Sequence, residues 1–161
     1  IAVETVTYNG SAQEPAVVVT FNGNALVEGV DYDVFYAENV NAGKGSVVVT
    51  LKGKYAGTKT ISFTIAKAKQ SITKAVVKKT LKASLLKKKA ASFKINAKAK
   101  GKVSYAKVSG SKNIKVSKAG TVTIKKCTKK GTYTIKVKIT AAATSYYLSK
   151  SVTKTIKVVV K

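Results

Sequence analysis

The sequence predicts an all-β protein built from two antiparallel β-sandwiches in tandem. Apolar residues alternate with polar ones nearly throughout: in KTISFTI (59–65), Ile61, Phe63 and Ile65 fall on one face and Ser62 and Thr64 on the other. This alternation is typical of half-buried strands. The expected strands are short and separated by turn residues, and no long stretch has a helical period, which favours sandwiches over mixed folds.

The first part of the chain contains four segments rich in β-branched and aromatic residues, which predict strands. Turn signals precede the first segment at Asn9-Gly10 and separate later ones at Asn22-Gly23 and Ala42-Gly43. The expected strands are 16–21, 31–37, 46–51 and 60–65.

The second part continues in the same style. The expected strands lie near 71–77, 91–99, 103–108, 113–117, 121–126, 132–140 and 151–160. In 132–140, Ile135, Val137 and Ile139 follow Tyr133 in the buried row, so Lys136 and Lys138 point outward. The only helix-like stretch is Leu81 to Ala91, for which we favour a loop and a strand over a helical turn.

Charge divides the chain into two domains, 1–66 and 67–161. The first holds four lysines and six acidic residues, a net charge of −2, and all its acids precede residue 39. The second holds 27 lysines and no acid, which brings the whole chain to +25. Segments with such different chemistry are not expected to share one core.

The composition excludes several classes of function. Without histidine and with one cysteine, the chain cannot form the usual zinc sites, histidine-based triads or an internal disulfide, so we expect no enzyme, no metal and no cofactor. Every basic residue is lysine, a flexible point charge poorly suited to reading bases, so we expect no specific nucleic acid. No apolar run approaches the roughly 20 residues of a transmembrane segment. Because the chain starts at Ile1 and lacks methionine, we expect a piece of a longer or processed protein.

A family resemblance covers most of residues 3–66. The run EGVDYDVFYAENVNAGKGSVVVTLKGKYAGTKTISFTI (28–65) resembles the immunoglobulin-like repeats of large surface and secreted proteins of Gram-positive gut bacteria. The matching residues are Tyr8, Gly10, Pro15, Gly29, Asp31, Tyr32, Tyr36, Asn39, Asn41, Ala42, Gly43, Gly53, Tyr55, Gly57, Phe63 and Ile65.

Residues 69–160 resemble the group 2 bacterial immunoglobulin-like domain. The resemblance rests on FKINAKAKGKVSYAKVSGSKNIKVSKAGTVTIKK and on GTYTIKVKITA with the later tyrosines, while Cys127 stands where a small residue such as glycine is common. Together the two resemblances imply Ig-like sandwiches in an extracellular bacterial surface or secreted protein, serving as a spacer or adhesive module. They imply no particular ligand and no catalysis.

Lysine pairs and triplets in expected turns and strand ends form the first candidate site. A strongly positive surface attracts polyanions such as anionic cell-envelope polymers, but it also describes a soluble, self-repelling spacer, and both interpretations remain open. The candidate polyanion-binding residues are Lys78, Lys79, Lys87, Lys88, Lys89, Lys125, Lys126, Lys129 and Lys130.

Three further features have a functional and a structural interpretation. Tyr146 and Tyr147 could offer a platform for a sugar, although we favour a tyrosine that closes the end of a sandwich. Asp31 and Asp33 could contribute to a calcium site, but we favour turn and surface polar groups. Cys127, among four lysines, would be reactive if exposed, and we favour an inert, partly buried residue.

The sequence therefore favours a non-catalytic extracellular spacer whose lysine-rich half associates with an anionic cell envelope. The alternative is an adhesin module that binds a host glycan or protein through loops at one end of a sandwich.

Overall fold

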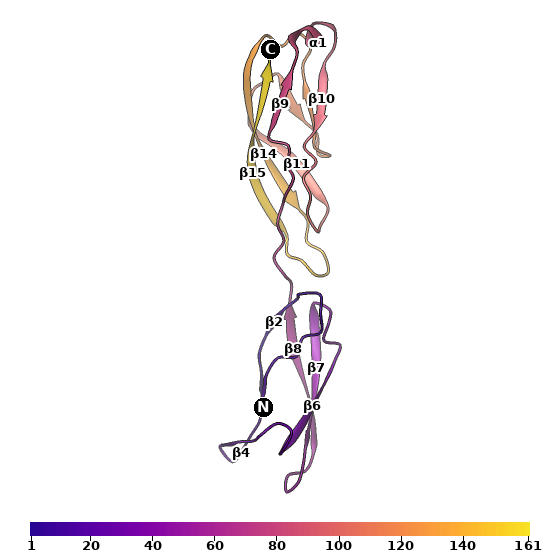
Figure 1. Cartoon of the computed structure of the whole chain (residues 1–161), viewed down its shortest axis with the longest axis vertical. Coiled ribbons are helices and arrows are strands. Elements are labelled where there is room, and N and C mark those ends of the chain that lie inside the picture. The colour runs from indigo at the N-terminus through magenta and orange to yellow at the C-terminus, as the bar shows by residue number, and fades with distance from the viewer. The chain divides into compact units, whose positions relative to one another are not determined.

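The computed structural model describes residues 1–161 and divides into two compact units, Ile1–Ala68 and Lys69–Lys161 (Figure 1). The regular secondary structure of each unit is almost entirely β-strand, and the only helix has six residues. The all-β, tandem-sandwich class predicted from the sequence is confirmed.

The first unit contains one four-stranded sheet, in the order β2-β8-β7-β6, and two small two-stranded sheets, β1-β3 and β4-β5. Strand β2 pairs with β8 in parallel, and the other pairs of the large sheet are antiparallel. The strands are β1 (Ala2–Val3), β2 (Val6–Thr7), β3 (Val17–Val18), β4 (Thr20–Phe21), β5 (Asn24–Ala25), β6 (Tyr32–Ala37), β7 (Gly43–Leu51) and β8 (Thr58–Ala66).

The core of the first unit is built by alternation, as the sequence predicts. Val47 and Val49 on β7 are fully buried, and Val17 on β3 and Val19 between β3 and β4 belong to the same core. The predicted strand 16–21 is interrupted at Val19, so that its two halves, β3 and β4, belong to different sheets. Buried Tyr32 joins the layers, because its hydroxyl donates to the Val17 carbonyl oxygen at 3.0 Å.

The second unit is a sandwich of a three-stranded sheet, β10-β13-β12, and a four-stranded sheet, β11-β14-β15-β9. All of its strand pairs are antiparallel except β15 with β9. Its elements are β9 (Lys78–Leu81), α1 (Ala83–Lys88), β10 (Ala91–Lys94), β11 (Val103–Gly110), β12 (Ile114–Val116), β13 (Thr121–Ile124), β14 (Gly131–Ala141) and β15 (Lys150–Val160).

Strand β14 shows how the sequence sets the packing of the second unit. Ile135, Val137 and Ile139 are buried in the core, while Lys136 and Lys138 between them are exposed. Isoleucine and valine on the facing strands complete the interior, in which Ile114, Ile124 and Ile156 are at most 1% exposed.

The first strand of the second unit differs from the prediction. Residues 71–77 form no named strand, although Thr73 and Val76 hydrogen-bond with Lys98 and Ile95 beside the three-stranded sheet. The chain then crosses to the other sheet, where β9 pairs with the end of β15. Alternation alone does not reveal such a change of sheet, and Lys74, in the middle of this segment, has a left-handed backbone with φ +55° that interrupts the expected strand.

The prediction of a loop and a strand for 81–91 is wrong at the centre of this segment, where α1 forms. Leu86 is fully buried and lies three residues after half-buried Ala83, the spacing that puts two side chains on one helical face. The helix is held from outside: the Ala83 N–H donates to the Lys161 carbonyl oxygen, and the Leu86 carbonyl accepts from the Cys127 N–H. These tertiary contacts stabilise a helix too short to persist alone.

Candidate polyanion-binding surface

The positive charge of the second unit is not neutralised by ion pairs with acidic side chains of that unit. It holds 26 of the 31 lysines and no aspartate or glutamate. The only salt bridge, between Lys52 and Asp33, belongs to the first unit. A surface of this kind attracts anions over a distance comparable to the Debye length, about 8 Å at physiological ionic strength.

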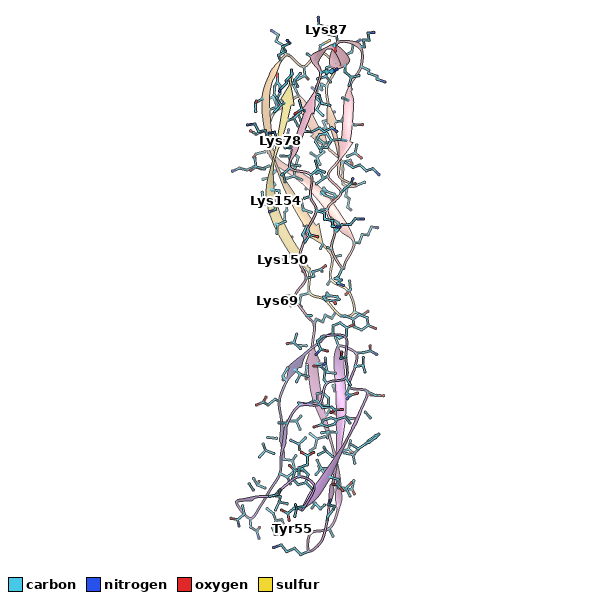
Figure 2. All side chains as sticks on the ribbon, viewed as in Figure 1. Tyr55, Lys69, Lys78, Lys87, Lys150 and Lys154 are labelled. Atoms are coloured by element: carbon cyan, nitrogen blue, oxygen red, sulfur yellow. The ribbon has the colours of Figure 1, made fainter.

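Seven of the nine predicted lysines gather at the end of the second unit that holds α1, and we call them the end cluster. The helix, its C-cap and the β13–β14 turn meet there through the Leu86–Cys127 backbone hydrogen bond, and Figure 2 places Lys87 at this end. The end cluster consists of Lys87, Lys88, Lys89, Lys125, Lys126, Lys129 and Lys130, all exposed.

Lys78 and Lys79 do not belong to the end cluster. Both lie on β9, farther along the sheet, as Figure 2 shows for Lys78. Because neighbouring residues of a strand point to opposite faces, their ammonium groups do not act on one ligand together. Lys79 pairs with buried Val158 and lies on the core side, whereas Lys78 pairs with exposed Lys157 on the outer side.

A hollow of about 520 Å³ lies beside the end cluster, lined in part by Lys87, Lys129 and Lys130. Cys127 also lines it and is exposed, so the expectation of a partly buried cysteine is wrong. Cys127 lies in the turn between β13 and β14 and has φ +61°, a left-handed conformation.

The sequence reasoning missed the outer face of the four-stranded sheet. From the sequence, Lys136 and Lys138 on β14 were interpreted only as solvated residues. The sequence does not show which residues of the neighbouring strands lie beside them. The strand register brings Lys157 and Lys78 onto the same face, where they are directly opposite each other. Knowledge of the parallel β15–β9 pairing would have been needed to find this group.

The two predicted loop tyrosines lie between β14 and β15, with Tyr146 36% exposed and Tyr147 half-buried. Their backbone N–H groups both donate to the Thr144 hydroxyl, at 3.1 and 3.0 Å. The Lys100 ammonium lies 5.7 Å from the centre of the Tyr147 ring. The Thr144 hydroxyl therefore organises the backbone of this loop through two local hydrogen bonds.

The two aspartates of the first unit, Asp31 and Asp33, have structural partners. Asp31 accepts a hydrogen bond from the Val27 N–H at 2.9 Å, and Asp33 pairs with the Lys52 ammonium at 2.9 Å. No group of three or more aspartate, glutamate or cysteine side chains comes together as metal ligands would.

Two tyrosines of the first unit, Tyr32 and Tyr36, have pKa values above the ordinary range of tyrosine. Burial raises the pKa of Tyr32, and the Glu28 carboxylate raises it further. Burial is also the main cause of the raised pKa of Tyr36, followed by Glu28 and Glu14. Both hydroxyls donate to backbone carbonyls, those of Val17 and Pro15, so these groups hold the fold rather than a ligand.

An aromatic pair in the first unit was also missed. Phe21 on β4 is half exposed, and its ring centre lies 5.3 Å from that of Tyr55 in the β7–β8 turn. Phe21 lines an apolar hollow of about 260 Å³ together with Leu26 and Leu51. The signal was present in the G-K-Y-A-G turn, but the hairpin that brings Phe21 to it is not visible in the sequence.

Comparison with known proteins supports the fold. No protein-family model matches the sequence, and no curated protein matches it. Among solved structures, extracellular cadherin domains 1–4 of protocadherin gamma B7 are 11% identical over 98% of this chain and 48% of theirs, with a TM-score of 0.50.

Two other solved structures are similar. The human desmocollin-1 ectodomain is 10% identical over 98% of this chain and 38% of its own, with a TM-score of 0.47. A SusE-like surface located polysaccharide binding protein from the Bacteroides thetaiotaomicron heparin utilisation locus is 12% identical over 83% and 36%, with a TM-score of 0.41. The chain thus spans less than half the length of each, and at these identities the likeness concerns the fold alone.

The one helix of the chain, α1, is six residues long and far too short to cross a bilayer.

Proposed function

We propose that this chain is a non-catalytic module of an extracellular bacterial surface or secreted protein, acting as a spacer that also associates with the cell envelope. In this proposal residues 1–66 are an immunoglobulin-like surface repeat, and 67–161 are a group 2 bacterial Ig-like domain from a Gram-positive cell wall or secreted protein. The β-sandwich architecture and the motif resemblances support the assignment.

The observation that carries the envelope association is the unneutralised charge of the second unit. Its 26 lysines include the end cluster and the exposed lysines of the strand faces, with no acid among them. Anionic wall polymers release counterions when such a surface binds them, so the affinity falls steeply as salt rises. Lysine suits this role, because attraction to a flexible polymer needs charge rather than fixed bidentate geometry.

The test is the binding of the full chain to purified anionic wall polymer across a salt series. We expect binding at low ionic strength that weakens progressively as salt is added. The first unit alone, residues 1–68, serves as a control of nearly neutral charge. Equal binding at low and high salt would contradict an electrostatic association.

The second candidate function is recognition of a host glycan or protein by loops at the end of a sandwich. The observation that favours it is the apolar hollow bordered by Phe21, with Tyr55 in contact with that ring. Exposed aromatic faces bind apolar surfaces and sugar rings without depending on charge. Tyr146 and Tyr147 remain the second aromatic candidate, on the second unit.

Glycan-array binding at high salt distinguishes this candidate from the first. Signal that persists at high salt and disappears in Phe21→Ala would support recognition by the first unit. Loss in Tyr146→Ala or Tyr147→Ala would place it on the second unit instead. A complete absence of signal at high salt would reject the adhesin function for the glycans on the array.

A further inference from the structure

Four lysines form a continuous track on the outer face of the β11-β14-β15-β9 sheet. Lys138 and Lys136 are two residues apart on β14, a separation of about 7 Å along an antiparallel strand. Lys157 on β15 is paired with Thr134, which places it diagonally from Lys136 at roughly 8 Å. Lys78 on β9 is paired directly with Lys157, about 5 Å away across the ladder. We call Lys78, Lys136, Lys138 and Lys157 the lysine track.

The outward positions around the lysine track carry mostly small hydroxyl side chains. Ser104, Ala106 and Ser109 on β11 are paired with outward residues of β14 and cannot shield the lysines. Thr140 and Ser151, on neighbouring strands, share a hydrogen bond of 2.9 Å, which shows that both side chains lie on this face. The remaining outward hydroxyls belong to Thr80, Thr132, Thr134, Thr153 and Thr155.

The track includes a pairing that is unfavourable in the free protein. Like charges directly opposite each other on neighbouring strands destabilise a sheet. Lys157 and Lys78 are such a pair, and the second unit supplies no carboxylate side chain to lie between them. An anionic group bound between the two ammonium groups would turn this repulsion into attraction.

We infer that the lysine track is the principal contact for a linear phosphodiester polymer of the polyol phosphate type, which carries one negative charge in each repeat. This inference rests on the proposed envelope association and gives it a location. The backbone steps from Lys78 to Lys138, about 5, 8 and 7 Å, are each short enough for flexible lysine side chains to reach successive phosphates of an extended chain of this kind. The threonine and serine hydroxyls beside the track donate hydrogen bonds to phosphate oxygens.

A phosphodiester polymer without bases fits this face better than a single-stranded nucleic acid. Proteins that hold single strands place aromatic side chains under successive bases. The outward positions of the sheet contain lysine, threonine, serine, alanine and valine, and no aromatic residue. The face thus offers charge and hydroxyls but no surface for base stacking.

The end cluster fits an extended polymer less well than the track does. Lys87 and Lys88 are consecutive helical residues, so their side chains diverge by about 100° around α1. The remaining five lysines occupy the C-cap and turns rather than regular strands. Their charges contribute to diffuse attraction, without the regular spacing of the sheet.

Two variants with equal charge separate the track from diffuse attraction. The track variant carries Lys78→Gln, Lys136→Gln, Lys138→Gln and Lys157→Gln, and the end variant carries Lys88→Gln, Lys89→Gln, Lys129→Gln and Lys130→Gln. All eight residues are exposed, and each variant loses four positive charges. Binding of full-length chain to labelled poly(glycerol phosphate) is measured by fluorescence anisotropy over a salt series.

We expect the track variant to bind at least about tenfold more weakly than the unmodified chain. The slope of log affinity against log salt concentration should become shallower by about 3, because four lysine–phosphate contacts are lost. The end variant should lose less than about threefold. Equal losses in the two variants, with salt-dependent binding by the unmodified chain, would overturn the track while leaving the envelope association intact. Salt-independent binding by the unmodified chain would overturn the proposed function itself.

Two further measurements keep the inference testable without relying on variants. In NMR titrations of the unmodified chain with poly(glycerol phosphate), amide shifts should be largest at Thr134, Thr153 and Thr155, and shifts largest in α1 would overturn the track. Oligothymidylate of equal charge serves as the nucleic-acid probe. Tighter binding to oligothymidylate than to poly(glycerol phosphate) would contradict the polyol phosphate assignment.

Discussion

Gln70 joins three segments at one end of the second unit through its buried amide. Its nitrogen donates to the carbonyl oxygens of Ala142 and Leu148 at 2.9 and 2.7 Å, and its oxygen accepts from the Gly101 N–H at 2.9 Å. The side chain is only 8% exposed. A buried glutamine is stable only when its donors and acceptors are used, and here both ends of the amide are bonded.

Replacing Gln70 with alanine should lower the free energy of unfolding of the second unit by about 2 kcal/mol, because a buried N–H at Gly101 loses its acceptor. Urea denaturation followed by circular dichroism measures the loss. Lys69→Ala, at the exposed neighbouring residue, is the control and should change stability by less than about 0.5 kcal/mol. Equal effects of the two substitutions would contradict the assigned role.

The conformation of Cys127 leads to a second prediction. A residue with a side chain is strained at φ +61° by roughly 1 to 2 kcal/mol, and glycine is not. The side chain is exposed, so Cys127→Gly loses no core packing. The relief of strain is partly offset by the greater conformational entropy of glycine in the unfolded chain. The net result should be a second unit more stable by about 0.5 kcal/mol. Thermal unfolding measures the change, and Cys127→Val, β-branched, should be destabilising. A less stable glycine variant would show that the thiol makes a contact of its own.

The raised pKa values of Tyr32 and Tyr36 predict how the first unit responds to alkali. The folded pKa lies above the unfolded value of 10.0 for both, because burial disfavours the phenolate and nearby carboxylates add to the effect. Their contribution to stability is therefore complete below pH 10 and is lost as pH rises through the folded pKa values. Urea unfolding across this range should show a weaker pH dependence in the Tyr32→Phe, Tyr36→Phe double variant. An unchanged pH dependence would exclude these groups as the cause.

At the level of single residues, the sequence predicted which side chains face inward better than it predicted local backbone conformation. Ile135, Val137 and Ile139 are buried as their alternation indicates, because a strand has a fixed period. The exposure of Cys127 was not predictable from its neighbours, since it depends on a left-handed turn whose energy is balanced by a backbone hydrogen bond to α1.

Among the elements, α1 illustrates how tertiary contacts determine a short helix. Its leucines are adjacent in sequence and differ completely in environment: Leu86 is fully buried and Leu85 is 41% exposed. Leu86→Ala should lower the free energy of unfolding of the second unit by about 3 kcal/mol, because it leaves a cavity in the core. Leu85→Ala, the matched control, should cost less than about 1 kcal/mol, and both are measured by urea denaturation. Similar costs would mean that α1 does not pack as described.

The strands were predicted far better than their pairing was. Periodicity identifies a strand and its buried face, but the neighbour of each strand is decided by long-range packing. For this reason Lys78 was grouped in the sequence with the turn lysines, whereas the register places it beside Lys157. The nine lysines named from the sequence are exposed, but the sequence does not say which of them lie side by side, and their role as a binding site stays a prediction.

For the whole molecule, the separate cores predict two independent unfolding transitions. The cluster around Val47 and Val49 contains only residues of the first unit, and the cluster around Leu86 only residues of the second. Val47→Ala should shift one transition and Leu86→Ala the other, each by several degrees, in differential scanning calorimetry. A chain of residues 69–161 alone should retain the second transition. One shared transition affected by both substitutions would contradict separate domains.

Parallel pairing of an early strand with the last strand, seen as β2 with β8 and as β9 with β15, gives each unit a particular response to mechanical force. When the two ends of a unit are pulled apart, the paired strands are dragged past one another, so their hydrogen bonds are loaded together instead of opening one by one like a zip. The second unit has four residue pairs in this ladder and the first has two. Under tension, the lysine-rich unit should thus be the later of the two to yield.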